Sequence, residues 1–157
     1  GKVVLILGSG PADKLETASL FFTTALNVAR QRIWIATPYF IPDEATMTAL
    51  RLALLKGLDV RIITPELNDN WFVKNAARVY LSELSQLGAR IYYYKKGFMH
   101  QKVMLLDDNI SIVGTVNFDN RSFRLNFEVS AAVADREFAQ QVDAMLREDI
   151  RNSRELI

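Results

Sequence analysis

The chain has 157 residues, of which 50% are hydrophobic and 24% are charged, and it contains no cysteine. This length and composition indicate one globular domain spanning residues 1–157, and they exclude a disordered tail, a disulfide scaffold, a thiolate nucleophile and a zinc site built on sulfur. Lysine and arginine outnumber aspartate and glutamate by only 19 to 18, so the overall charge gives no support for binding to nucleic acid or to an anionic membrane.

Short β-branched runs alternate with amphipathic stretches along the first part of the chain. The first helix is predicted to begin at Asp13, with Glu16 three residues later, and to carry an apolar stripe from Leu15 to Ala29. Further helices are predicted over 43–56 and 70–87, and strands over 2–7, 32–37, 59–64 and 90–94.

The pattern changes after Gly97. Strands are predicted over 99–106 and 110–116, joined by the turn Asp107-Asp108-Asn109, followed by a strand over 127–133 and a helix over 135–150. Strands interleaved with helices and then a hairpin predict an α/β sandwich with a mixed sheet. The phenylalanine, methionine and leucine residues of the amphipathic stripes are predicted to form its core.

One histidine occurs in the whole chain, His100, and it begins a His-x-Lys-x4-Asp spacing with Lys102 and Asp107. Alternate residues of a strand share a face, so His100 and Lys102 are expected to point the same way. Asp107 has the opposite parity and suits the turn.

The predicted hairpin also places residues that follow the turn opposite His100 and Lys102. If its loop consists of Asp108-Asn109 alone, Asn117 lies opposite His100, and Thr115 lies opposite Lys102. A bulge or a three-residue loop would shift this register. With the shorter loop, one face of the hairpin gathers an imidazole, an ammonium, an amide and a hydroxyl.

These groups suit a phosphodiester. Lys102, Asn117 and Thr115 can donate to the non-bridging oxygens of a phosphoryl group, and a neutral imidazole can attack phosphorus to form a covalent intermediate. The other ring nitrogen of His100 needs an acceptor to fix its tautomer, and Glu128 in the next strand is the natural candidate. The sequence offers no cluster at metal-ligand spacing, so we expect no metal and no other cofactor, and Lys102 could take the part of a metal.

The spacing His100-x-Lys102-x4-Asp107, followed by Gly114-Thr115-x-Asn117, resembles the signature of the phospholipase D superfamily. Three further segments resemble the second, C-terminal catalytic half of bacterial cardiolipin synthases, and they are Thr37-Pro38-Tyr39-Phe40-Ile41-Pro42, Gly114-Thr115-Val116-Asn117-Phe118-Asp119-Asn120-Arg121-Ser122 and Leu125-Asn126-Phe127-Glu128. The resemblance covers essentially the whole chain.

The resemblance implies an α/β/α sandwich in which two halves, each with its own motif, build one active site. His100 would be one of two catalytic histidines, Lys102 and Asn117 would bind phosphate, and Thr115 would assist. Glu128 would orient the ring of His100. Asp107, the last residue of the catalytic motif, would hold the hairpin.

The reaction that the resemblance implies is the transfer of a phosphatidyl group from phosphatidylglycerol, through phosphohistidine, to the hydroxyl of another phospholipid, which yields cardiolipin. The parent protein would act at the cytoplasmic face of the bacterial inner membrane. No signal peptide is readable and the chain begins with Gly1, so we expect it to be either a processed product or an excised piece of something longer, and to be soluble itself.

The chain carries one motif where a complete family member has two. Attack on phosphorus and protonation of the leaving group need opposite protonation states at once, and one imidazole with a reference pKa of about 6.5 cannot supply both. A lone copy should therefore be nearly inert, and the second histidine must come from the missing half or from another copy across a two-fold interface.

Two other interpretations remain open. The first is a homodimeric phosphodiesterase or nuclease, for which Lys95-Lys96 near His100 offers local support although the net charge does not. The second is a module that kept the fold without the chemistry. The aromatic pair Tyr39-Phe40 either meets lipid or packs in the core or in a loop.

Overall fold

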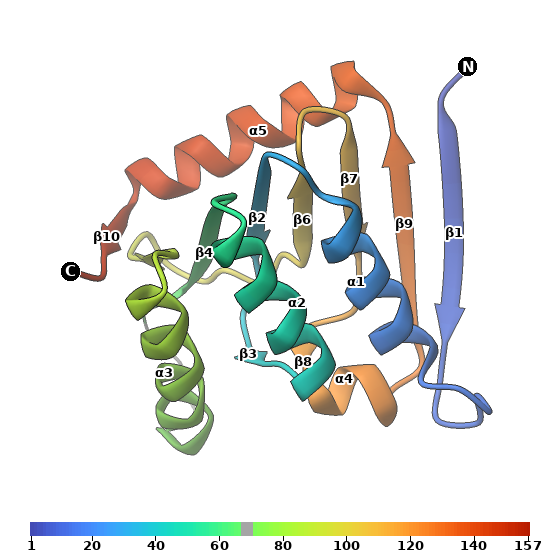
Figure 1. Cartoon of the computed structure of the whole chain (residues 1–157), viewed down its shortest axis with the longest axis horizontal. Helices are drawn as coiled ribbons and strands as arrows, with labels where there is room; N and C mark the ends of the chain where they lie inside the picture. The colour runs from blue at the N-terminus through green and yellow to red at the C-terminus, as the bar shows by residue number, and fades with distance from the viewer. Residues whose placement is uncertain (67–70) are drawn as a thin grey trace.

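The computed structural model describes residues 1–66 and 71–157, and its centre is an eight-stranded mixed sheet (Figure 1). The strand order is β1 (Val3–Ser9), β9 (Glu128–Ala134), β7 (Ile110–Gly114), β6 (Val103–Leu106), β2 (Arg32–Ala36), β4 (Asp59–Pro65), β5 (Arg90–Tyr94) and β10 (Ser153–Glu155). Strands β2, β4 and β5 are parallel, and the other neighbouring pairs are antiparallel.

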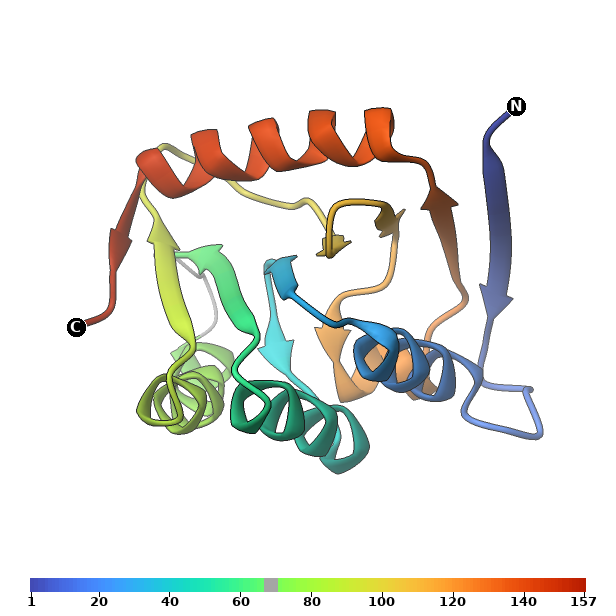
Figure 2. The same cartoon turned by 45° about the horizontal axis from the view of Figure 1, so that its top comes forward.

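Helices cover both faces of this sheet, which confirms the α/β/α sandwich. One face carries α1 (Thr17–Val28), α2 (Glu44–Leu55), α3 (Trp71–Gln86) and α4 (Asn120–Arg124), and the other carries α5 (Arg136–Arg151). Figure 2 shows α5 running along one side while α1, α2 and α3 lie on the other. Each layer buries its own apolar cluster, and the larger one lies under α1 to α4.

A second, two-stranded sheet joins two distant parts of the chain. Strand β3 (Phe40–Ile41) pairs in parallel with β8 (Phe118–Asp119), and the rings of Phe40 and Phe118 stack at 5.5 Å. Phe40 is fully buried, so this residue packs in the core. Two of the segments that carry the family resemblance, 37–42 and 114–122, are therefore neighbours in space.

The first helix differs from its prediction. It begins at Thr17 after Glu16, while the carboxylate of Asp13 accepts from the backbone N–H of Gly10 in the preceding turn at 3.1 Å. Leu15 consequently precedes the helix and is 68% exposed, whereas Ala18, Phe22 and Ala29 are buried as predicted. The cause is local, because an aspartate three residues after a glycine satisfies a turn as readily as a helix end.

The predicted strand over 99–106 is wrong at its start, because β6 begins only at Val103. Its partner β2 pairs with it no further than Ala36, and the chain beyond turns away at Pro38, which has no N–H to donate. The following strand likewise ends at Gly114 and not at 116. The helix predicted over 70–87 is observed as Trp71–Gln86, and its first predicted residue, Asn70, lies outside the described residues.

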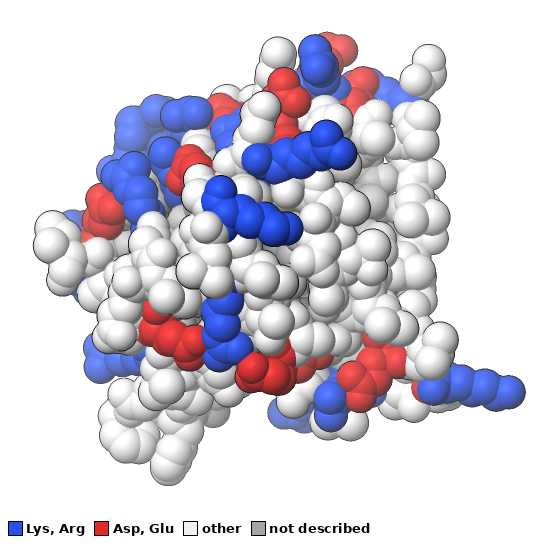
Figure 3. Space-filling view, viewed as in Figure 1, with Lys and Arg blue, Asp and Glu red and all other residues white. Residues whose placement is uncertain are grey.

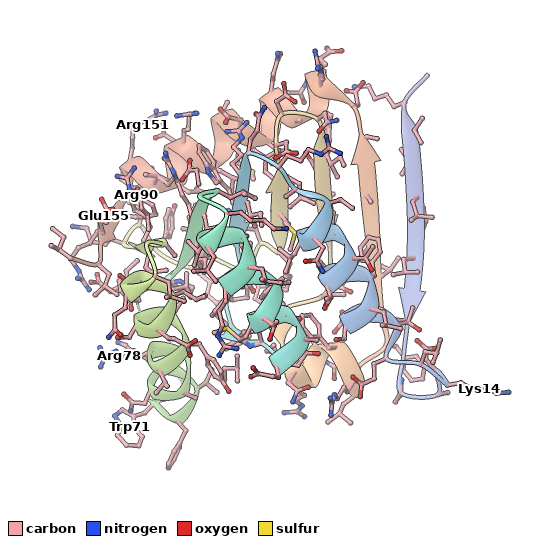
Figure 4. All side chains as sticks on the ribbon, viewed as in Figure 1. Lys14, Trp71, Arg78, Arg90, Arg151 and Glu155 are labelled. Carbon is pink, nitrogen blue, oxygen red and sulfur yellow. The ribbon has the colours of Figure 1, made fainter. Side chains whose placement is uncertain are left out.

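The two edges of the sheet differ in character. On β1, Val3, Val4, Leu5 and Ile6 are 70%, 49%, 54% and 63% exposed, and Figure 3 shows this edge almost free of charged side chains. At the other edge, Arg90 pairs with Glu155 at 2.8 Å and ties β5 to β10 (Figure 4). In the part of the chain that the structure describes, no helix has both the length and the apolar character that a bilayer crossing requires.

Candidate active site

The structure brings His100 and Lys102 together just before β6. Nζ of Lys102 lies 2.9 Å from Nδ1 and 3.2 Å from Nε2 of the His100 ring, and it also donates to the backbone oxygen of His100 at 2.7 Å. The backbone oxygen of Lys102 accepts from the N–H of Gly114 at 3.3 Å, which fixes this segment beside the end of β7. The imidazole and the ammonium therefore converge on one point, as the spacing predicts.

The surroundings of this pair leave the ring accessible and the ammonium partly enclosed. His100 is exposed, and Phe98 stacks on its ring at 5.4 Å. Burial lowers the pKa of the Lys102 ammonium, against the attraction of Glu128, which acts to raise that pKa. A partly desolvated ammonium holds an anion more tightly than one in open water.

The predicted register of the hairpin is wrong by one residue. Leu106 pairs with Ile110, so the loop is Asp107-Asp108-Asn109, and Lys102 comes opposite Gly114. Asp107 occupies the left-handed region with φ of 55°, a conformation that aspartate tolerates better than most residues. Asn117 and Thr115 are thus not directly opposite His100 and Lys102.

Thr115 is engaged with β9. Its Oγ1 accepts from the N–H of Val129 at 3.0 Å and lies 3.4 Å from the oxygen of the same residue, to which it donates. The neighbouring Gly114 allows this close approach, since a Cβ there would lie 2.3 Å from the Val129 oxygen. Gly114 and Thr115 therefore hold the end of β7 in close contact with β9.

Asn117 lies between β7 and β8, next to a connection made by the buried Thr37. The hydroxyl of Thr37 accepts from the N–H of Phe118 at 3.1 Å and donates to the oxygen of Tyr39 at 2.9 Å. Oδ1 of Asn117 is buried and has no hydrogen-bond partner among residues 1–66 and 71–157. Unpaired buried polar atoms are rare in folded proteins, and a catalytic or ligand-binding role is one explanation for them.

Glu128 opens β9, where it lies opposite Ser9 of β1. Its carboxylate attracts the ammonium of Lys102 and adds to the burial that raises the pKa of Asp119. Within the described residues it makes no hydrogen bond to His100. The structure thus associates Glu128 with the ammonium, and its role in orienting the ring stays a prediction.

Asp107 lies at the opposite end of β6 from His100 and does not join the pair. Its carboxylate accepts from the backbone N–H groups of Arg30, Gln31 and Arg32, with distances between 2.8 and 3.2 Å. Its backbone oxygen accepts from Nε of Arg32 at 2.7 Å. This residue fastens the hairpin turn to the start of β2.

Asp119 and Arg121 belong to the segment 114–122 that carries the family resemblance, but the sequence predicted no role for either. Asp119 caps α4 by accepting from the N–H of Ser122 at 2.7 Å, and burial raises the pKa of its carboxyl. With Tyr39 and Asn117, both residues line an open pocket of about 730 Å³. An aspartate is a favoured residue at a helix N-cap, but a five-residue helix is too short for an apolar periodicity to reveal it.

No group of three or more histidine, aspartate or glutamate side chains suited to a metal ion occurs in the described part of the chain.

Comparison with known proteins places this geometry in a family. The model described as "Cardiolipin synthase, PLD-like domain" matches residues 22–150. Cardiolipin synthase A of Pseudomonas putida strain F1 is 50% identical over 156 residues, which are 99% of this chain and 33% of that protein. The corresponding protein of Pseudomonas fluorescens strain Pf-5 is 49% identical over the same shares. The chain thus spans about a third of the length of these relatives.

Two solved structures share the fold at low sequence identity. Nuc, a phospholipase D family member from Salmonella typhimurium, is 20% identical, with a TM-score of 0.83 over 99% of each chain. Phosphatidylserine synthase from Haemophilus influenzae is 17% identical, with a TM-score of 0.81 over 98% of this chain and 40% of that one. The match to the family model and the fold agree, and this chain belongs to the phospholipase D-like domain family of cardiolipin synthases.

Proposed function

We propose that this chain is one catalytic half of a cardiolipin synthase. The full-length protein would transfer a phosphatidyl group from one phosphatidylglycerol to the terminal hydroxyl of another, releasing glycerol. The convergence of His100 and Lys102 carries this proposal, since it sets a nucleophile beside a cation that can hold a phosphate oxygen. The relatives at about 50% identity, all named cardiolipin synthase A, favour a lipid substrate.

In the first step, a ring nitrogen of His100 attacks phosphorus while Lys102 and the amide of Asn117 hold the non-bridging oxygens. The nitrogen–phosphorus bond forms as the bond between phosphorus and the glycerol oxygen breaks. The released glycerol oxygen takes a proton from a second imidazole. Attack requires an unprotonated ring nitrogen, because only that nitrogen carries a lone pair that can form the bond to phosphorus.

The second imidazole has to come from another half, because this chain has one histidine. We place that half in the same parent chain, since the relatives are about three times as long as this one. The exposed apolar edge strand β1 favours a neighbouring domain, because such an edge is a ready surface for association.

The remaining motif residues support the pair from a distance in this proposal. Glu128 balances the charge of Lys102 and orients the imidazole once substrate is bound. Thr115 acts through its contact with Val129, which holds the end of β7 near the phosphate. Asp107 acts by anchoring the hairpin.

The alternative, a homodimeric phosphodiesterase or nuclease, has less support. The solved structure of Nuc is 20% identical to this chain, so the likeness between the two concerns the fold alone. Sedimentation of the 157-residue chain would address this alternative, since a stable dimer that cleaves a simple diester would favour it.

The direct test uses the full-length protein and radiolabelled phosphatidylglycerol in vesicles. We expect labelled cardiolipin and one glycerol for each cardiolipin formed. Labelled phosphatidic acid without cardiolipin would show a hydrolase and overturn the transferase assignment. We place the full-length protein at the bacterial inner membrane, and fractionation of cells would test that location.

A further inference from the structure

The pocket beside Asn117 is distinct from the space around His100 and Lys102, neither of which lines it. It opens between β3, β8, α4 and the start of α3, and its volume is about 730 Å³. Its lining combines basic, amide and apolar side chains. These residues are Tyr39, Ile41, Val73, Asn117, Asp119, Asn120, Arg121, Ser122, Arg124, Leu125 and Asn126.

Two arginines give the pocket its positive character, and they differ in their partners. Arg124 pairs with Glu16 at 3.1 Å. Arg121 is exposed, and its guanidinium has no acidic partner among the residues that the structure describes. The carboxylate of Asp119, the acidic residue in the lining, accepts hydrogen bonds from the N–H and the hydroxyl of Ser122. The guanidinium of Arg121 is thus the group in this pocket best suited to an anion from outside.

The proposed reaction requires a second phosphate to be bound near the first. In phosphatidylglycerol, the attacking terminal hydroxyl is separated from the molecule's own phosphate by the three carbons of the head-group glycerol. When that hydroxyl reaches the phosphorus held by Lys102 and Asn117, the acceptor's phosphate must lie only a few ångströms beyond. Asn117 links the two places in this proposal, because it lines the pocket and the proposed function assigns its amide to the first phosphate.

We propose that this pocket binds the phosphate of the acceptor phospholipid and that Arg121 is its principal contact. The inference rests on the proposed function and adds to it a determinant of acceptor specificity. Asn120 and Asn126 supply further donors around the bound phosphate. The hydroxyl oxygen of the acceptor forms a bond to phosphorus, and the bond from phosphorus to the His100 nitrogen breaks with its electron pair returning to the ring. The hydroxyl proton passes to the second imidazole.

The apolar part of the lining favours a lipid over a soluble anion. Leu125 is 64% exposed at the pocket, and Tyr39 lies on its wall. Trp71, 67% exposed, stands at the outer end of α3 (Figure 4), two residues before the pocket residue Val73. Tryptophan is enriched where membranes meet water, so this position suits a site that takes its ligand from a bilayer.

The test compares two small acceptors in the full-length protein, glycerol and sn-glycerol 3-phosphate, with phosphatidylglycerol in vesicles as donor. Glycerol 3-phosphate reproduces the hydroxyl-to-phosphate spacing of the lipid acceptor, and glycerol lacks the phosphate. We expect the unaltered protein to prefer the phosphate-bearing acceptor. In Arg121→Gln the ratio of the two kcat/KM values should fall about tenfold or more, and Arg121→Lys should retain part of the preference. Arg136→Gln, an exposed arginine at the start of α5 on the other face of the sheet, should keep the ratio.

The outcomes separate this inference from the function on which it rests. An unchanged ratio in Arg121→Gln, or an equal loss with both acceptors, contradicts the acceptor site while leaving the transferase intact. A loss with glycerol 3-phosphate but full cardiolipin synthesis from phosphatidylglycerol means that the pocket takes only a soluble phosphate, which also overturns the inference. Failure of the unaltered protein to transfer to any acceptor contradicts both proposals. Coincident thermal unfolding curves confirm that the exposed substitution leaves the fold intact.

Discussion

Nζ of Lys102 lies 2.9 Å from Nδ1 of His100, although the two residues stand outside the strand that was expected to align them. What holds them together is the backbone bond from Gly114 to Lys102 and the contact of the ammonium with the His100 backbone oxygen. The pair is therefore positioned by the ends of β6 and β7, and its geometry depends on how those ends are fixed.

Gly114 is the first place to test that dependence. A Cβ at this position would meet the Val129 oxygen at 2.3 Å and Cα of Ser130 at 2.8 Å, both of them backbone atoms that cannot swing aside. We expect Gly114→Ala to lower the free energy of unfolding by about 1–3 kcal/mol, measured by urea denaturation. Gly8→Ala is the matched control, because a Cβ there meets nothing within 4 Å. Equal stability of the two variants would show that β7 and β9 can separate without penalty.

Asp107 is expected to support the fold and not the chemical step. Replacing it by alanine removes the acceptor for the N–H groups of Arg30, Gln31 and Arg32 and leaves alanine at a φ of 55°. We expect a loss of about 1–3 kcal/mol in the free energy of unfolding, and a smaller loss for Asp107→Asn, which tolerates that backbone conformation. In the full-length protein, kcat per folded molecule should stay near the unaltered value. A large fall in kcat with unchanged stability would show that Asp107 takes part in the chemical step.

Two capping aspartates should respond in opposite ways to pH. Burial acts to raise the pKa of Asp43, but hydrogen bonds from Ser19 and Thr46 outweigh it, and the pKa lies below its ordinary value. Ionised Asp43 thus stabilises the fold above the unfolded-state pKa of about 3.9, and that contribution is lost as the pH falls through the lower folded value. Asp43→Asn should destabilise the protein by about 1–2 kcal/mol at pH 7 and by less at pH 3.

The pKa shift of Asp119 is opposite in direction to that of Asp43, because burial raises the pKa of the Asp119 carboxyl. Ionisation of this group weakens the fold as the pH rises through the raised pKa, while asparagine keeps the cap. Asp119→Asn should therefore equal or exceed the stability of the unaltered protein at pH 7, and any advantage should shrink in acid. Urea midpoints for both variants between pH 3 and pH 7 provide the measurement, and parallel pH profiles would contradict this account.

Much of the fold follows from the sequence because periodicity is informative over long segments. The helices around Met47 and Val142 and the strands containing Ile35 and Ile62 were all predicted, and these side chains are buried. The elements that were not predicted are short. Strands β3 and β8 are two-residue strands paired across the chain, and a pattern confined to one segment cannot reveal such a pairing.

The site was predictable in its residues more than in its geometry. Spacing alone indicated that His100 and Lys102 share a direction, and they do. The predicted register was wrong because a turn of two residues and a turn of three are both compatible with the same Asp-Asp-Asn sequence. The hydrogen bonds from Asp107 to the chain before β2 favour the turn of three. Arg121 was given no role because the pocket that it lines forms only when β3 and β8 pair.

The most direct test of the whole account replaces His100 by alanine in the full-length protein and measures cardiolipin formed from labelled phosphatidylglycerol. His100 is exposed, so the substitution should leave the folded structure intact, which the thermal unfolding curve checks. We predict a fall in turnover of about 10³-fold or more, since the proposed covalent intermediate or the proton transfer paired with it would be lost. Turnover equal to that of the unaltered protein would show that this half contributes only structure.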